Sequence, residues 1–359
     1  TAGKSDEWFP ILPGTDSMVA LAMAHVIANE GLWDKEFIER WTNTSPVRLL
    51  HHLNPYTPQK AESVSGVRAS DIKRIAVEFA NARPGVAIGG GGALKHINGT
   101  SNQKAILLLN AIVGSLDIKG GFFFPQSYPL DAPDPKPPKS KRMNPESQHL
   151  FVRVSRGVQQ VGVLMTHMDN PVYKGPDSKF ISYVLQDEGK IPFLISIDPF
   201  LNESNIFADL VLPEATYLER WDLLSPPSMD GVPFIALRQP MAKPPGQALP
   251  FSEILIELAH RMGGELDRYF KFGRTEHYIE AMIRKIPKLV DAGGIDFLME
   301  KGIWVDPDRK PQYSSNGKKR VRTPSGRFEF EPSLPSYSPI PHHQRMKESE
   351  FHLITFQWN

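Results

Sequence analysis

Four consecutive glycines at positions 89–92 form the first pattern in the sequence that suits ligand chemistry. Glycine has no side chain, so a glycine-rich backbone can approach a flat or phosphorylated ligand closely. The helix expected to follow would offer free N–H groups to an anion at its first turn. The spacing is not a dinucleotide fingerprint, because counting from the first or second glycine puts Leu94 or Lys95 at the sixth position. A simple turn explains the glycines about as well as a binding site does.

Polar side chains also lie where two expected strands of a parallel sheet end. Asn170 follows the strand 162–166, and Ser196 and Asp198 lie at the end of the strand 191–197. Open α/β sheets bind ligands beyond the carboxyl ends of their strands. A carboxylate there can accept hydrogen bonds from ribose hydroxyls or from the N–H groups of a base. The alternative is that Asp198 and Asn170 only form turns, and the residues alone favour neither reading.

Several other chemistries lack the residues they need. The chain has no cysteine, which excludes disulfides, thiolate catalysis and iron–sulfur ligation within this stretch. The pairs His51-His52 and His342-His343 are adjacent in sequence, and neighbouring residues do not face one site on a helix or strand. The motifs of zinc proteases, serine hydrolases and P-loop nucleotidases are absent.

The composition is that of an ordinary globular chain. It has 359 residues, of which 40% are hydrophobic and 23% charged, and this length suggests two or three domains. The net charge of +1 provides no field that would attract nucleic acid or an anionic membrane. No apolar run is long enough to span a membrane, and no secretory signal opens the sequence.

Helices and strands that alternate along the chain predict two α/β units with parallel sheets. Apolar residues at helical spacing predict helices over 16–30, 34–41, 70–82, 100–113, 179–185, 250–262 and 277–285. A buried strand is expected over 84–88, further strands over 162–166, 191–197 and 208–213, and an isolated strand over 326–330. These strands would place the glycine run and the polar residues at sheet edges.

The segment 120–150 changes character, because it is rich in proline and basic residues and is typical of a linker or long surface loop. The chain opens without methionine, and its last residues, 351–359, are typical of a strand that is cut off. We therefore expect a fragment of a longer polypeptide.

Residues 13–16, 21–27 and 31–37 together resemble a stretch shared by molybdopterin oxidoreductases of the dimethyl-sulfoxide-reductase superfamily. The resemblance continues in the family's order through the glycine run with His96, residues 98–100, 107–111, 114–116 and 119–121, Asp198, residues 208–213 with Glu219, and residues 323–329. These segments cover most of the chain. Residues 217–222 and 236–240 look most like the catalytic subunits of polysulfide, thiosulfate, tetrathionate and arsenic-oxyanion enzymes.

The resemblance implies an α/β fold of two Rossmann-like sub-domains with mainly parallel sheets, truncated before a C-terminal β-barrel domain. Residues 1–120 would be the remainder of an inserted α/β domain, 121–160 a Pro-rich linker and 161–335 the second α/β domain. Residues 336–359 would be a linker and the first strand of the barrel. The family's cysteine cluster, with its 4Fe-4S centre, and its molybdenum ligand would precede this stretch.

The implied cofactor is molybdenum bound by two pterin-guanine dinucleotides. The resemblance implies that this cofactor is contacted by Gly14, Thr15, Asp16, Gly91, Gly92, His96, Asn98, Asn170, Ser196 and Asp198. By polarity, Asp16 and Asp198 would accept hydrogen bonds from guanine or ribose, and His96 and Asn98 would bond phosphate or pterin edges. No residue is expected to be catalytic, because the metal performs the chemistry while the protein binds and tunes the cofactor.

The implied activity is oxygen-atom or electron transfer with a small oxyanion of sulfur or arsenic. Expected partners are an iron–sulfur electron-transfer subunit and a membrane anchor, without nucleic acid, and the expected compartment is periplasmic or membrane-associated, with a cytoplasmic location as the alternative. Two other readings stay open at this point. One is a molybdenum-free relative that is a structural or electron-relay subunit of a respiratory complex, and the other is a nicotinamide-dependent dehydrogenase, which the glycine spacing disfavours.

Overall fold

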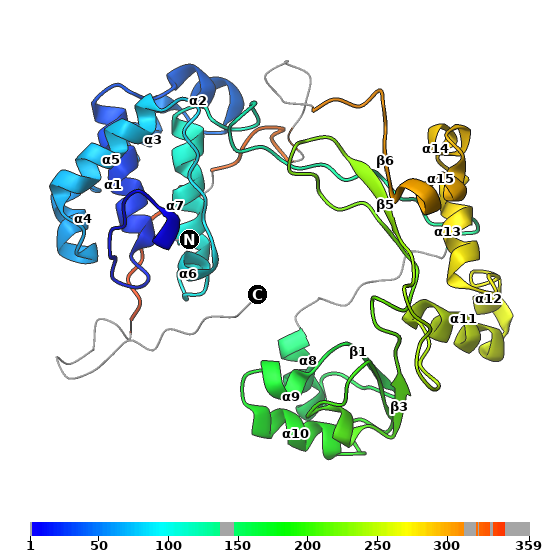
Figure 1. Ribbon diagram of the computed structural model, residues 1–359. Coiled ribbons are helices and arrows are strands. Elements are labelled where there is room, and N and C mark those ends of the chain that lie inside the picture. Colours follow the sequence, from blue (N-terminus) through cyan, green and yellow to red (C-terminus); the bar gives the residue numbers. More distant parts are fainter. Residues whose placement is uncertain (1, 137–146, 312–320, 322, 331–332, 342–359) are drawn as a thin grey trace. The chain divides into compact units, whose positions relative to one another are not determined.

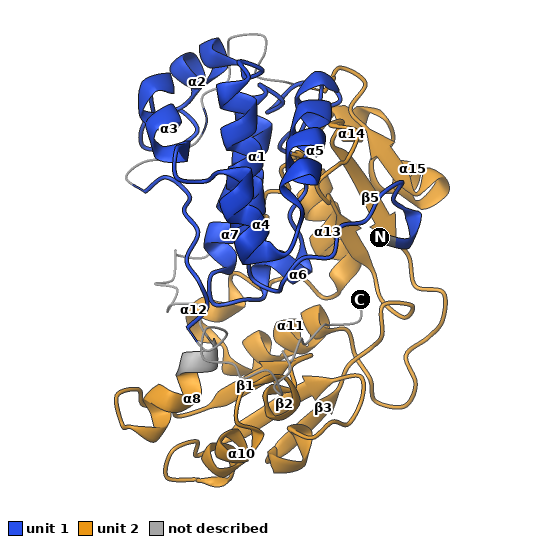
Figure 2. Cartoon of the chain, turned by 90° about the vertical axis from the view of Figure 1, so that its left-hand side faces the viewer, with its two compact units in different colours: residues 1–124, 312–359 blue, residues 125–311 orange. Residues whose placement is uncertain are grey.

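The computed structural model describes residues 2–136, 147–311, 321, 323–330 and 333–341, and the chain divides into two compact units (Figures 1 and 2). Unit 1 comprises Thr1–Phe124 and Gln312–Asn359, and unit 2 comprises Pro125–Pro311. The expected closing strand over 351–359 and the pair His342-His343 lie outside the described residues. The domain boundaries predicted from the sequence stay a prediction.

Unit 1 is helical in its described part. Its helices are η1 (Ala2–Lys4), α1 (Asp16–Asn29), α2 (Lys35–Trp41), α3 (Pro46–Leu53), α4 (Pro58–Ser65), α5 (Ala69–Asn81), α6 (Gly91–Leu94) and α7 (Gly99–Ile112). Helix α1 is apolar on most of its surface, and Met18, Leu21 and Ile27 are fully buried. It packs against α7, α5, α4 and α3, so it forms the centre of the unit (Figure 1).

Short polar side chains determine where several of these helices begin. Asp34, Ser45 and Thr57 each accept a hydrogen bond from the backbone N–H three residues further on, at the starts of α2, α3 and α4. These bonds satisfy N–H groups that the first turn of a helix leaves without a partner. The predicted helices over 16–30, 34–41, 70–82 and 100–113 are confirmed within one or two residues at most ends.

The predicted buried strand over 84–88 is wrong. Ile88 is 79% exposed, and the segment forms no strand. The side chain of Asn110 replaces a neighbouring strand: its Oδ1 accepts from the N–H of Ala87 and its Nδ2 donates to the carbonyl of Ala87, both at 2.8 Å. One side-chain amide thus satisfies both backbone groups of Ala87, so this residue does not need a neighbouring strand as a hydrogen-bond partner.

A segment that we call the strap, residues 323–330 and 333–341, lies across the helices of unit 1. Phe328 forms an isolated parallel bridge with Thr42, and His52 Nε2 lies 2.8 Å from the carbonyl oxygen of Pro335. The strand predicted over 326–330 is therefore reduced to this single bridge. The strap closes unit 1 through contacts between distant parts of the sequence.

Unit 2 contains the predicted parallel sheet. Its strands are β1 (Leu164–His167), β2 (Leu194–Asp198) and β3 (Leu210–Pro213), in the order β1-β2-β3. The accompanying helices are α8 (Ser147–Ser155), α9 (Pro171–Lys174), α10 (Ser178–Gln186) and η2 (Asn205–Phe207). The register pairs Thr166 with Ser196, so the carboxyl ends of β1 and β2 are level. This sheet confirms the α/β class.

A second sheet in unit 2 is antiparallel and was not predicted. It consists of β4 (Asp222–Leu224), β5 (Phe234–Arg238) and β6 (Ile303–Val305), in the order β4-β5-β6. It shares a hydrophobic core with α13 (Thr275–Ile283), α14 (Pro287–Asp291) and α15 (Gly294–Lys301). Helices α11 (Phe251–Met262) and α12 (Gly264–Asp267) precede them in the chain and pack on each other. The expectation of mainly parallel sheets therefore holds for β1–β3 and fails for this half of unit 2.

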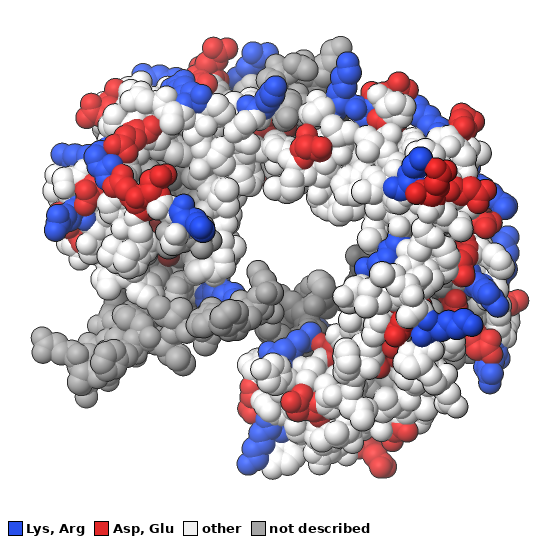
Figure 3. All heavy atoms as spheres, viewed as in Figure 1, with Lys and Arg blue, Asp and Glu red and all other residues white. Residues whose placement is uncertain are grey.

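Charged side chains of both signs are interspersed over the visible surface of each unit (Figure 3). No broad area of one sign appears on that face, which agrees with the net charge of +1. In the part of the chain that the structure describes, no helix is both long and apolar enough to cross a membrane.

Candidate functional site

The starts of α1 and α7 lie together in unit 1. Asn102, in the first turn of α7, accepts from the N–H of Ser17 at 3.2 Å and donates to Asp16 Oδ2 at 3.4 Å. Both helices are 14 residues long, and each carries a partial positive charge at its N-terminus. The structure therefore brings the predicted residues of the 14–16 segment next to those that precede α7.

Burial controls the acidity of Asp16. Loss of solvation raises the pKa of this carboxyl above its ordinary value, while its backbone hydrogen bond and the nearby His96 act in the opposite direction. His96 is half-buried in the loop between α6 and α7. The two predicted side chains are thus electrostatic neighbours, and a polar ligand at this place would meet both.

Gly14 and Thr15 shape the loop that enters α1. Gly14 has φ +78°, and an added Cβ would lie 2.4 Å from Cδ1 of Ile340, so conformation and space both require glycine. The hydroxyl of Thr15 donates to the carbonyl of Leu12 at 2.6 Å. These contacts give both residues a structural role, and their contact with a cofactor stays a prediction.

The side chain of Asn98 holds the same region together through hydrogen bonds. It is 8% exposed, and its Nδ2 donates to the carbonyls of Gly14 and Ser338, each at 2.7 Å. Its Oδ1 lies 3.3 Å from Nδ2 of Asn102, which donates to it. A direct bond from Asn98 to a phosphate, which needs a donor, would have to replace one of the two bonds that Nδ2 donates.

The four glycines of the run differ in what an added side chain would meet. An added Cβ on Gly89 would lie 1.9 Å from Gln103 Oε1, so the flexible end of the Gln103 side chain would have to move. On Gly90 and Gly92 the same atom would meet nothing within 4 Å, and on Gly91 only the end of a lysine side chain at 4.0 Å. Their backbone φ angles are not in the left-handed region. Packing and conformation therefore leave these three glycines unexplained, and a ligand lying on the bare backbone would explain them.

Two buried oxygens of unit 1 also suit a polar ligand, and one of them, Gln103 Oε1, lies beside Gly89. Among the described residues, Ser17 Oγ and Gln103 Oε1 are buried without a hydrogen-bond partner. Buried polar atoms normally have one. Unfulfilled acceptors next to a bare glycine backbone fit a heterocycle or nucleotide that presents N–H or O–H groups.

In unit 2 the carboxyl edge of the parallel sheet carries Asp198. Its Oδ1 accepts from the N–H of Phe200 at 3.0 Å, and its Oδ2 accepts from Asn202 Nδ2 at 3.0 Å. A carboxylate offers about four acceptor positions, so Asp198 retains capacity for the N–H groups of a base. It is also partly exposed, as such contact requires.

Asn170 caps the short helix α9 at the same edge. Its Oδ1 accepts from the N–H of Tyr173 at 3.3 Å and from Ser204 Oγ at 2.7 Å, and its Nδ2 donates to Glu203. Asn170 is thus tied to the loop that follows β2. Asn170 therefore does form a turn, and its contact with the cofactor stays a prediction.

Ser196 lies inside the edge rather than on its surface. It is 2% exposed, and its hydroxyl accepts from Asn205 Nδ2 and from Thr166 Oγ1, the latter at 3.2 Å. Ser196 therefore supports the edge through Asn205 and Thr166. A direct contact with the cofactor stays a prediction.

The structure thus assembles the ten predicted residues into two groups, one in each unit. Sequence reasoning missed Asn102, which holds the first group together, and Asn202, Ser204 and Asn205, which hold the second. It also missed the unpartnered oxygens of Ser17 and Gln103. The signals were an asparagine one helical turn after Asn98 and the polar run 202–205 directly after a strand end. Within the described residues, no group of three or more His, Asp or Glu side chains could hold a metal ion.

The parallel sheet of unit 2, with hydrogen-bonding side chains at the carboxyl edge where open α/β sheets bind their ligands, makes this an α/β protein. Residues 1–261 match the molybdopterin oxidoreductase family. The chain belongs to this family, which implies a molybdenum–pterin cofactor.

The relatives include several bacterial reductases. The chain is 27% identical to the probable dimethyl sulfoxide reductase chain YnfF of Escherichia coli over 92% of its own length and 47% of that relative. It is 28% identical to the thiosulfate reductase molybdopterin-containing subunit PhsA of Salmonella typhimurium, over 75% of this chain and 39% of the relative. The chain thus spans about half the length of the curated relatives it matches.

Among solved structures, acetylene hydratase from Pelobacter acetylenicus has the same fold, with a TM-score of 0.76. The match covers 94% of this chain and 52% of the hydratase, at 22% identity. This likeness supports the arrangement of helices and strands described above.

Proposed function

We propose that this chain forms part of the cofactor-binding body of a molybdenum oxidoreductase whose cofactor is the bis-pterin-guanine-dinucleotide form. The observation that carries the proposal is the carboxyl edge of β1–β3, where Asp198 and Asn170 are linked through the loop 199–205. In open α/β sheets this edge is the usual ligand position. The bare glycine loop of unit 1 is the second surface we assign to the cofactor.

Each group of residues would make a distinct kind of contact. Asp198 would accept from the N–H groups of guanine or the hydroxyls of ribose, held in place by Phe200 N–H and Asn202. In unit 1 the backbone of Gly90, Gly91 and Gly92 would let the cofactor approach closely, while Gln103 Oε1 would accept a hydrogen bond. When bound, the molybdenum–pterin group supplies the electron- or oxygen-transfer chemistry.

The substrate proposed is a small sulfur or arsenic oxyanion. The names of relatives support this class, since they include a thiosulfate reductase subunit and the arsenate respiratory reductase subunit ArrA of a Shewanella species. The redox class rests on the family and these relatives, because the structural neighbour is a hydratase. Several relatives are named as chains or subunits, which supports a multi-subunit enzyme. As the other subunits we propose an iron–sulfur electron-transfer subunit and a membrane anchor, and as the location the periplasm or the membrane surface.

The test is the substitution Asp198→Ala in the purified protein. We expect bound molybdenum and pterin per polypeptide to fall by about tenfold or more, because each charge-assisted hydrogen bond is worth roughly 1.5–3 kcal/mol. Metal analysis gives the molybdenum, and GMP released by mild acid shows whether the pterin carries guanine nucleotide. Equal loading of variant and parent would remove Asp198 from the site and return it to the turn reading. Parent protein without molybdenum would favour the structural or electron-relay alternative.

Asp209→Ala is the matched control. Asp209 also accepts a backbone hydrogen bond, from the N–H of Leu194 at 2.7 Å, but it lies at the amino edge of the same sheet. Its loss should lower the melting temperature without lowering the molybdenum content. If both variants lost the cofactor equally, the loss would be a general effect of a weaker sheet.

A further inference from the structure

A buried carboxylate joins two residues at the edge of a separate cavity in unit 2. Glu214 directly follows β3, and its side chain is 0% exposed. Its Oε2 lies 2.8 Å from His167 Nε2, and its Oε1 accepts from Arg220 Nη1 at 2.5 Å. Because a buried carboxylate is stable only when it is paired, Glu214 fixes the positions of both the imidazole and the guanidinium.

Arg220 also pairs with Asp222, which in turn pairs with Arg238. Arg220 Nε donates to Asp222 Oδ2 at 3.2 Å, and Arg238 Nε donates to the same oxygen at 3.1 Å. Two carboxylates are thus balanced by two guanidinium groups, with the His167 imidazole as a further partner of Glu214. Within the described part of the chain, Arg220 Nη2 has no hydrogen-bond partner, so this cluster can still donate to an acceptor.

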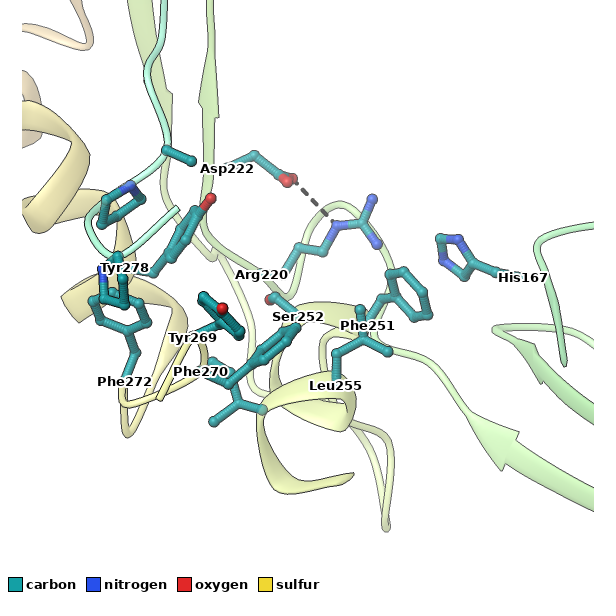
Figure 4. Close-up of a pocket in the computed structure, with 14 residues that line it drawn as sticks. His167, Arg220, Asp222, Phe251, Ser252, Leu255, Tyr269, Phe270, Phe272 and Tyr278 are labelled. Carbon is teal, nitrogen blue, oxygen red and sulfur yellow. Dashed lines mark hydrogen bonds and ion pairs between the residues drawn. The ribbon is translucent and has the colours of Figure 1, made fainter. Parts of the chain in front are cut away.

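The cavity beside this cluster has a volume of about 410 Å³ (Figure 4). His167, Arg220 and Asp222 line one part of it. Aromatic side chains from α11, from the segment between α12 and α13 and from α13 line much of the remainder, namely Phe251, Tyr269, Phe270, Phe272 and Tyr278, together with Ala132, Pro133 and Pro135. Its size is that of small-molecule sites, which are mostly apolar with a few placed polar groups. The residues assigned above to the molybdenum–pterin cofactor do not line it.

The walls of the cavity favour a flat ligand. The imidazole of His167 lies parallel to the ring of Phe251, with centroids 3.7 Å apart and an interplanar angle of 7°. Phe272 and Tyr278 meet edge to face at 5.2 Å. Aromatic rings arranged in this way stack on or pack edgewise against another planar ring.

We propose that this cavity is a second small-molecule site, for a planar aromatic ligand that carries an anionic oxygen such as a carboxylate. The ring would pack among the aromatic walls, and the oxygen would accept from the Arg220 guanidinium at the polar end. Both carboxylates there are already bonded to cations, so an acceptor suits this end and a cationic donor does not. The site is independent of the proposed molybdenum cofactor.

The test is calorimetric titration of the purified protein with 2-naphthoate, compared with 2-naphthylmethylammonium, which has the same rings and the opposite charge. We expect naphthoate to bind at least about tenfold more tightly than the ammonium compound. Absence of naphthoate binding, or equal affinity for the two compounds, would overturn the proposal. Naphthoate binding should be unchanged in Asp198→Ala, because that residue belongs to the other site.

Two substitutions on one helix locate the binding. Leu255→Trp on α11 places a large ring in the cavity and should abolish naphthoate binding, whereas Leu258→Trp, on the same helix but outside the lining, should leave it unchanged. Retained binding in Leu255→Trp would place the ligand elsewhere. Arg220→Lys, which keeps the charge but loses the fork geometry, should weaken naphthoate about tenfold and leave the residual affinity of the ammonium compound unaltered.

Discussion

The side-chain amide of Asn98 donates a hydrogen bond to the carbonyl of Gly14, 2.7 Å away, although 84 residues separate the two in the sequence. The same nitrogen also donates to the carbonyl of Ser338 in the strap. One buried amide therefore joins the start of α1, the start of α7 and the strap. Loss of this amide should weaken the contacts among all three segments.

Asn98→Asp should destabilise unit 1 by roughly 1–3 kcal/mol, because it removes both donated bonds and sets an oxygen of a buried side chain against two carbonyl oxygens. The measurement is the free energy of unfolding from urea titration. Asn29→Asp makes the same chemical change at an exposed position, where the amide bonds only to the carbonyl of His25, and should shift stability by no more than about 0.5 kcal/mol. Equal effects of the two would show that the Asn98 contacts are unimportant.

Asp16→Asn should stabilise the protein at neutral pH. Burial raises the pKa of Asp16 above its ordinary 3.8, so the folded state favours the neutral carboxyl, and ionisation costs stability as pH rises through that raised pKa. The asparagine cannot ionise and can still accept from Asn102. The difference in melting temperature should therefore be largest near pH 7 and vanish below about pH 3.8. A difference that does not change with pH would contradict this assignment.

Gly92→Ala should leave the melting temperature of the cofactor-free protein nearly unchanged, because the added Cβ meets nothing within 4 Å. Molybdenum content should nevertheless fall if the cofactor lies on this backbone. Gly99→Ala is the contrasting variant, since its Cβ would lie 2.0 Å from the carbonyl oxygen of Leu94, and it should impair folding itself. Full cofactor loading in Gly92→Ala would leave the glycine run without a ligand-based explanation.

Glu214→Gln should cost roughly 1–3 kcal/mol of stability, because Arg220 loses a buried charged acceptor. The same substitution at Glu36, whose pair with Arg40 spans 4.0 Å at the surface, should cost no more than about 1 kcal/mol. Parallel urea titrations compare them directly. Similar small losses at both sites would mean that Glu214 does not fix His167 and Arg220.

The sequence predicted elements that depend on local pattern. Helices such as α1 and α7 follow from apolar spacing, and the sheet β1–β3 follows from short apolar runs that end in polar turns. The strand over 84–88 failed because Asn110, on a helix, bonds both backbone groups of Ala87. The antiparallel sheet was missed because β6 pairs with β5 across a long stretch of chain, and periodicity carries no information on such pairing.

In the candidate site, too, local pattern predicted some features and missed those that depend on distant contacts. Asp198 and Asn170 could be placed at one sheet edge from the rule for parallel strands, and the structure does place them there. Their coupling through residues 202–205 depends on how one loop folds back, which no spacing rule gives. Glu214 gave no local signal either, because its partners His167 and Arg220 lie on opposite sides of it in the sequence.

The strap sets an order of events during synthesis. A ribosome completes unit 2 before it reaches the strap, while Asn98 is made 240 residues before Ser338, its acceptor. At roughly 5–20 residues per second this interval is on the order of 10–50 s. Throughout it, the amino-terminal helices exist without their contacts with the strap, and the Asn98 amide lacks the acceptor that Ser338 supplies.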